Sequence, residues 1–124
     1  MSSLSICIPV YQYRPDTLLK ALIAQSEHLK IPVEILLFDD GSEEPSRFAN
    51  RKWGEHPLVE YREMGRNIGR AAIRNKLVKE AKSEFCLFLD NDSELVKNDF
   101  LETYWRYHQA APVICGGRVY PASP

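Results

Sequence analysis

Short apolar segments alternate with amphipathic helical patterns along this chain. The segments predicted as strands are residues 3–10, 33–38, 58–62, 85–89 and a last one that begins at 113–115. The helices predicted between them are residues 15–30, 43–53, 70–82 and 98–110. This alternation favours a parallel sheet with right-handed crossovers and helices on its faces. We therefore expect 124 residues to form one α/β domain, with a Rossmann-like, mostly parallel sheet.

Charge and cysteine content narrow the class of protein. The chain has 16 basic and 17 acidic residues, so a broad nucleic-acid-binding surface is not expected. Cys7, Cys86 and Cys115 lie in apolar stretches with no zinc-binding spacing, which predicts buried free thiols in a reducing cytoplasm. No apolar run approaches the length of about 20 residues that a membrane span needs, and the first residues do not resemble a signal peptide.

The stretch 85–92 places two carboxylates directly after five apolar residues. An unbroken apolar run of this length predicts a central strand that is buried on both faces. Asp90 and Asp92 then follow the carboxyl end of that strand, where open parallel sheets bind ligands. Two carboxylates can hold a hard divalent cation, although such a pair more often caps the next helix.

Two further polar clusters, residues 11–14 and 39–42, follow other predicted strands. All three clusters should meet at one edge of a parallel sheet. By itself, the Asp-Asp-Gly-Ser sequence at 39–42 is more often a turn than a binding site. Arg70 and Arg74 are four residues apart and share one helix face, which is either solvated or directed at an anion. Carboxylates with a metal on one side and arginine on the other would match a nucleoside diphosphate.

Four motifs, in this order, resemble the N-terminal half of family-2 glycosyltransferases of the GT-A fold. They are residues 5–11, 37–42, 67–75 and 88–92, which together extend over most of the chain. The resemblance implies metal-dependent transfer of a sugar, with inversion, from a nucleotide donor to an acceptor hydroxyl. The implied donor is a UDP-sugar held with Mg²⁺ or Mn²⁺, and the implied acceptor is a carbohydrate or a lipid-linked molecule. The implied location is the cytoplasm, or the inner face of the membrane through regions outside this chain.

The resemblance also implies roles for individual residues. Nucleotide binding is implied for Pro9, Val10, Tyr11, Asp39, Asp40, Arg70, Arg74, Asp90 and Asn91. By the family pattern, Asp39 hydrogen-bonds the base, Asp40 lies near the ribose, and Asp92 ligates the metal with Asp90 beside it. Oxygen ligands suit Mg²⁺ or Mn²⁺, and such a cation stabilises negative charge on the departing diphosphate.

The sequence departs from the family pattern in two places, and two other functions are open. Gln12 follows Tyr11 where asparagine is more common, and Ile73 stands where a small residue is usual. The catalytic base is expected beyond residue 124, so the chain is predicted to be part of a longer enzyme. One alternative is a donor-binding module without transfer activity. A remote alternative is a receiver-type signalling domain, which has a similar size and clustered acids at strand ends.

Overall fold

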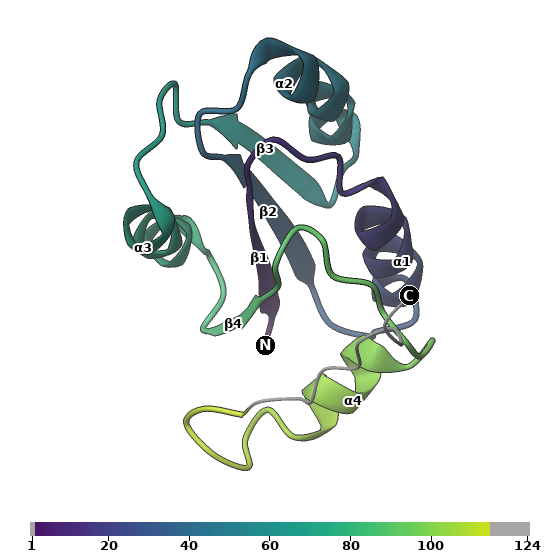
Figure 1. Ribbon diagram of the computed structural model, residues 1–124. Helices are drawn as coiled ribbons and strands as arrows, with labels where there is room; N and C mark the ends of the chain where they lie inside the picture. The colour runs from purple at the N-terminus through teal and green to yellow at the C-terminus, as the bar shows by residue number, and fades with distance from the viewer. Residues whose placement is uncertain (1, 115–124) are drawn as a thin grey trace, which may run out of the picture.

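A four-stranded parallel sheet forms the centre of the structure, a computed structural model that describes residues 2–114. Its strands are β1 (Leu4–Val10), β2 (Val33–Asp39), β3 (Val59–Glu63) and β4 (Phe85–Phe88). Their order across the sheet is β3-β2-β1-β4, and every neighbouring pair is parallel (Figure 1). The predicted α/β fold with a Rossmann-like parallel sheet is confirmed.

Helices cover both faces of this sheet. They are α1 (Asp16–Ser26), α2 (Glu44–Asn50), the 3-10 helix η1 (Arg51–Glu55), α3 (Arg70–Glu80) and α4 (Phe100–Arg106). One apolar cluster joins alternate residues of β1 and β2 to α1, η1 and α4. A second, smaller cluster joins the other face of these strands to Ile73 and Leu77 of α3. The two clusters use alternate strand residues because successive side chains of a strand point to opposite faces.

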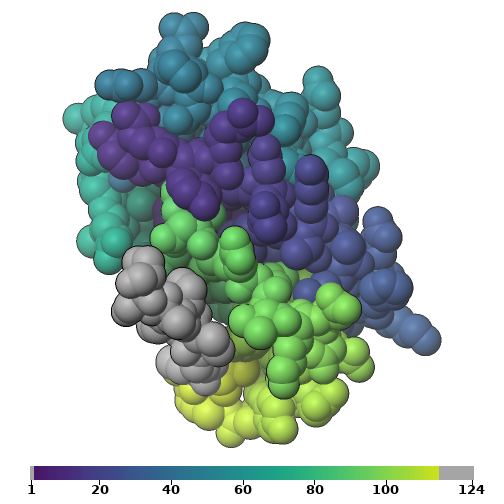
Figure 2. Space-filling view, turned by 45° about the vertical axis from the view of Figure 1, so that its right-hand side comes forward, coloured from purple at the N-terminus to yellow at the C-terminus, as the bar shows by residue number. Residues whose placement is uncertain are grey.

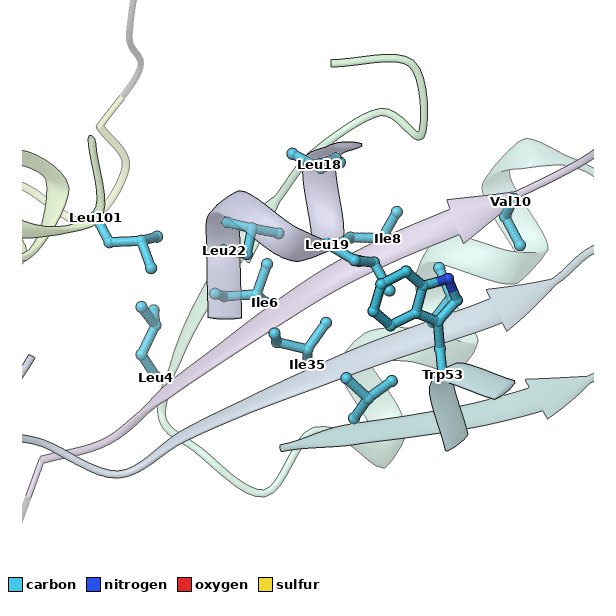
Figure 3. Packing of buried hydrophobic residues seen from close by; sticks show 12 residues of the cluster. Leu4, Ile6, Ile8, Val10, Leu18, Leu19, Leu22, Ile35, Trp53 and Leu101 are labelled. Atoms are coloured by element: carbon cyan, nitrogen blue, oxygen red, sulfur yellow. The ribbon is translucent and has the colours of Figure 1, made fainter. Parts of the chain in front are cut away.

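The larger cluster is the main apolar core. Leu22 of α1 has no exposed surface and lies close to Ile6 of β1 (Figure 3). Trp53 of η1 and Leu101 of α4 extend this cluster toward opposite ends of the sheet (Figure 3). Burial on this face therefore fixes α1 against the two central strands, β1 and β2, and with it the loop that precedes α1.

Leu22→Ala is expected to lower the free energy of unfolding by about 2–5 kcal/mol, because it removes buried methyl groups and leaves a cavity. Val96→Ala is the matched control, since Val96 is 71% exposed, and its effect should stay within about 0.5 kcal/mol. Urea denaturation of both variants measures the difference. Losses of equal size would mean that the Leu22 contact does not carry the expected stability.

Within residues 2–114, the expectation that residues 85–89 form a central strand buried on both faces is not met. β4 pairs with β1 alone and lies at an edge of the sheet formed by residues 2–114. Its residues are only partly buried, and Cys86 is exposed. A run of apolar residues indicates that a segment is buried, but it does not specify which strands or helices cover it. Phe85 is covered in part by Trp105 of α4, with ring centroids 5.5 Å apart.

The predicted burial of the cysteines was correct for Cys7 and wrong for Cys86. Cys7 of β1 is buried, and burial raises the pKa of its thiol to about 12. Cys86 lies on the exposed side of β4. Cys115 lies outside the described residues.

Several element boundaries and faces also differ from the predictions. α1 ends at Ser26 rather than at residue 30, because the chain continues in short i→i+3 turns from Gln25 onward. α4 is shorter than predicted at both ends, and similar turns follow it. On α3, helical spacing predicts that Ile73, Leu77, Val78 and Ala81 lie on the buried face. Only Ile73 and Leu77 of these are buried, and Val78 is exposed. Residues 113 and 114 are not in a strand, and the rest of the predicted last strand lies outside the described residues.

Candidate functional site

The three polar clusters predicted to converge lie at the same edge of the sheet. Val10 of β1 and Asp39 of β2 are neighbours in the parallel register. Leu89, which follows β4, donates its N–H to the carbonyl of Cys7 at 3.1 Å, so Asp90 also emerges at this edge. The β4–α4 segment packs against the β1–α1 segment in the space-filling view (Figure 2). A small hollow of about 40 Å³ between them is lined by residues of both, including Tyr13, Arg14 and Asn91.

The two carboxylate oxygens of Asp39 differ in their contacts: one accepts a hydrogen bond within the local turn, and the other has no partner among residues 2–114. Its Oδ2 accepts the N–H of Ser42 at 2.8 Å, so the turn alternative considered for residues 39–42 is realised. Its side chain is fully buried, and Oδ1 has no hydrogen-bond partner among residues 2–114. A buried carboxylate oxygen without a partner is costly unless a ligand or water supplies a donor.

Asp40 points to the opposite side of the turn and holds the segment that enters α3. Its Oδ1 accepts the N–H of Ile68 at 2.7 Å, and its carbonyl accepts the side-chain amide of Asn67 at 3.1 Å. Gly41 lies so close to this segment that a Cβ atom there would be 2.3 Å from the backbone nitrogen of Asn67. The Asp40-Gly41 pair therefore determines where the first turn of α3 begins.

The two arginines of α3 differ in their contacts. Arg74 places Nη2 3.4 Å from Oδ1 of Asp90, and its guanidinium lies 5.8 Å from the ring centre of Phe88. Its Nε is buried and has no hydrogen-bond partner in the described chain. Arg70 is the first residue of α3 and is exposed. The structure thus brings Arg74 to Asp90 after β4 and leaves Arg70 exposed at the N-terminus of α3.

The Asp90-Asn91-Asp92 segment forms a tight turn in which Ser93 donates its N–H to the carbonyl of Asp90 at 3.1 Å. Asp92 is exposed, whereas Asp90 and Asn91 are half-buried. Residues 2–114 contain no group of three or more acidic, histidine or cysteine side chains that could hold a metal ion. Mg²⁺ commonly uses one or two carboxylates and completes its shell with waters and substrate phosphates. The donor set of Asp90 and Asp92 fits such a partly open site.

The β1–α1 loop is fixed by contacts that could not be predicted from the sequence. Gln12 adopts a positive φ of 52° and donates its N–H to Oγ of Ser42 at 2.8 Å. Asn50 of α2 is fully buried and donates its side-chain amide to the carbonyl of Tyr13 at 2.7 Å. The helix at 43–53 reads as a surface helix, so no sequence signal distinguished Asn50 from a solvated residue. These contacts leave Tyr11 exposed beside the strand ends.

A charged cluster borders Asp39 on the side of β3. Glu63 is the register neighbour of Asp39 and accepts hydrogen bonds from Arg51 at 2.8 and 3.1 Å. These bonds hold the pKa of Glu63 below its ordinary value, against the opposing effect of partial burial. Tyr61 also donates its hydroxyl to Glu63, and burial raises the pKa of that phenol. Arg51 and Tyr61 therefore stabilise the negative charge of Glu63 beside Asp39.

A family profile described as "Glycosyl transferase family 2" matches residues 5–123. The chain belongs to glycosyl transferase family 2. This membership confirms the resemblance and excludes the receiver-type signalling domain. The O-antigen biosynthesis protein RfbC of Myxococcus xanthus is 34% identical over 102 residues, which are 79% of this chain and 8% of that protein.

Solved structures of two other proteins share the fold of this family 2 chain. Residues 1–349 of S. aureus TarS in complex with UDP-GlcNAc match with a TM-score of 0.68 and 24% identity, over 86% of this chain and 31% of that one. The mannosyltransferase PcManGT from Pyrobaculum calidifontis, in complex with GDP-Man and Mn²⁺, matches with a TM-score of 0.69 and 23% identity, over 88% and 32%. The chain therefore spans about a third of each of these two solved chains.

Within residues 2–114, we find no helix with the length and apolar character that crossing a bilayer requires.

Proposed function

We propose that this family 2 domain binds a nucleotide-diphosphate sugar, with UDP as the nucleotide, and transfers the sugar to an acceptor hydroxyl with inversion. The observation that supports this most is the unpartnered Oδ1 of Asp39. It lies at the carboxyl edge of a parallel sheet, where ligands bind in folds of this kind. Tyr11 follows Val10, the register neighbour of Asp39, so its exposed ring is available to stack on the base.

The chemistry of Asp39 favours particular bases. The unpartnered carboxylate oxygen of Asp39 can accept a hydrogen bond, and the donor that a nucleobase can offer to it is an N–H group. Uracil and guanine carry a ring N–H between or beside carbonyl groups, whereas the equivalent ring nitrogens of adenine and cytosine accept hydrogen bonds. TarS and PcManGT are solved with UDP-GlcNAc and GDP-Man, two donors whose bases carry this N–H. A UDP-sugar, or less favourably a GDP-sugar, is the donor that these residues suit.

We propose that Asp92, with Asp90 beside it, holds Mg²⁺ or Mn²⁺ against the diphosphate. When bound, the cation would stabilise the negative charge that develops as the sugar–phosphate bond breaks. Arg74 contacts Asp90 and keeps that carboxylate oriented. PcManGT is solved with Mn²⁺ as well as its donor. Arg70 at the first turn of α3 remains available for a phosphate, because helix N-termini favour anions.

The acceptor is proposed from a relative alone. RfbC is named as an O-antigen biosynthesis protein, which supports a carbohydrate or lipid-linked carbohydrate as the acceptor. A donor-binding module without transfer activity is the second candidate, and we propose that the chain forms the N-terminal donor-binding part of a longer enzyme. Turnover of UDP-sugar to UDP distinguishes transfer or hydrolysis from binding alone.

Calorimetric titration of the chain with UDP, GDP and ADP, in the presence of Mn²⁺, tests donor binding. We expect UDP to bind most tightly and ADP most weakly, because only ADP lacks a ring N–H for Asp39. Equal affinities for the three nucleotides would contradict base recognition by this carboxylate. Absence of binding at millimolar concentrations would contradict the proposed function as a whole.

Asp92→Ala is expected to abolish the gain in UDP affinity that Mn²⁺ provides, because it removes the exposed carboxylate of the proposed metal site. Calorimetric titrations with UDP in Mn²⁺ and in EDTA measure that gain. Glu94→Ala is the control, since Glu94 is an exposed acid two residues away and should leave the Mn²⁺ dependence intact. If the wild-type affinity is the same in EDTA, the metal role is wrong.

A further inference from the structure

Among residues 2–114, no strand pairs with the outer edge of β3, which lies at the side of the sheet remote from β4. The carbonyl of Leu58 accepts from Ile35, and the N–H of Met64 donates to Asp39. In a parallel ladder the inward residues alternate, so residues 58, 60, 62 and 64 bond to β2. Val59, Tyr61 and Glu63 consequently direct their backbone groups away from the sheet. The N–H of Val59 is already used by His56 at 3.0 Å.

Space is open beside the first half of this strand. A hollow of about 360 Å³ is lined by Val59, Glu60 and Tyr61 together with Pro57 and Gly54. Unpaired strand edges accept another strand readily, and proteins usually protect them with charged side chains. Here the charges are Glu60, Arg62 and Glu63, and their order along the strand determines which partner is compatible.

The sequence Val59-Glu60-Tyr61-Arg62-Glu63 is complementary to itself in one antiparallel register. A two-fold axis at Tyr61 places Glu60 opposite Arg62 of a second copy, twice. These are positions without mutual backbone hydrogen bonds, where cross-strand side chains approach most closely. An axis at residue 60 or 62 would instead bring two glutamates or two arginines together. Like charges directly opposite destabilise pairing, so the pattern selects the register centred on Tyr61.

We propose that two copies of this chain associate through their β3 edges, with the two-fold axis at Tyr61. The two Tyr61 residues exchange backbone hydrogen bonds, and the N–H of Glu63 donates to the carbonyl of the partner's Val59. The sheet then continues from one copy into the other. This pairing uses no residue proposed to bind the donor, so it does not depend on the proposed function.

The side-chain environment agrees with this pairing. Within one chain, Nε of Arg62 lies 2.5 Å from Oε2 of Glu60 and forms an ion pair with it. Arg62 also lies 3.1 Å from Glu80 and keeps 42% of its side chain exposed. Glu60 also keeps 33% of its side chain exposed, so both charged groups remain accessible to a second copy despite their ion pair. Each is the partner that the other copy would supply.

Sedimentation equilibrium of the 124-residue chain at micromolar to millimolar concentrations tests the proposal. The mass is expected to rise from 14.3 kDa toward twice that value. Glu60→Arg and Arg62→Glu should each weaken association by about tenfold, because each replaces two attractive pairs with two repulsive ones. The double variant restores opposite charges and should recover association to within about threefold of the wild type.

Glu102→Arg is the charge-matched control for Glu60→Arg, since it makes the same change in net charge on exposed α4 surface and should leave association unchanged. Circular dichroism of each variant establishes that the monomer is folded. A wild-type chain that stays monomeric at every concentration would overturn the proposal. So would a dimer that is insensitive to both single changes, or folded single variants whose weakness the double variant does not repair.

Discussion

Gly41→Ala is expected to cause a large loss of stability among single substitutions at the donor edge, about 2–5 kcal/mol. The added Cβ would lie 2.3 Å from the backbone nitrogen of Asn67 and 2.4 Å from the carbonyl carbon of Arg66. Both atoms belong to the backbone, so neither can rotate away as a flexible side chain would. The positive φ of 75° adds strain for any residue with a Cβ. Urea denaturation measures the stability, and UDP titration measures the consequence for the site.

Gly65→Ala separates steric overlap from backbone strain. Gly65 has a similar φ of 81°, but no atom lies within 4 Å of the position its Cβ would take. We expect this variant to lose only the cost of the left-handed conformation, about 1–2 kcal/mol. Equal losses for the two variants would show that contact between Gly41 and the segment before α3 is not important.

Asp39→Asn is expected to weaken UDP binding by about 1.5–3 kcal/mol, which is roughly 10- to 150-fold. The amide can still accept the N–H of Ser42 through its oxygen, so the turn should persist. Its NH₂ group would then occupy the position of the unpartnered Oδ1 and oppose the N–H of the base. Calorimetric titration with UDP measures the affinity, and thermal denaturation tests whether the fold is retained.

Asp99→Asn is the control for the loss of one negative charge. Asp99 precedes α4, is exposed, and makes no side-chain cap to that helix. The affinity of the Asp99→Asn variant for UDP should equal that of the wild type. If the Asp39 variant keeps the wild-type affinity while remaining folded, this carboxylate does not contact the base.

Much of the fold could be predicted from periodicity alone. Strand and helix alternate because the spacing of apolar residues changes from two to about 3.6 residues and back. That pattern identified each strand and helix formed by residues 2–114 to within a few residues. The predictions that failed concern which side chains are buried, and not whether a segment is a strand or a helix. Cys86 and Val78 are apolar residues in correctly predicted elements, yet both are exposed.

The candidate site could be located from sequence because its parts follow strand ends. Once the strands were known to be parallel, Asp39 and Asp90 had to emerge at one edge. What each acid does there could not be predicted in the same way. Asp39 and Asp40 are adjacent in sequence, but a strand end turns their side chains to opposite sides. Oδ1 of Asp39 has no hydrogen-bond partner among residues 2–114, whereas Oδ1 of Asp40 accepts the N–H of Ile68.

The amino-acid sequence by itself determined the parallel α/β architecture, the order of the elements and the family. It could do so because periodicity and motif order are properties of the chain in one dimension. Only the tertiary structure decided which hydrogen-bonding groups are already satisfied. Three such features of residues 2–114 depend on contacts between residues distant in sequence: the unpartnered oxygen of Asp39, the close approach of Gly41 to Asn67, and the unpaired edge of β3. The site and the proposed association surface are therefore set by how the strands and loops pack together.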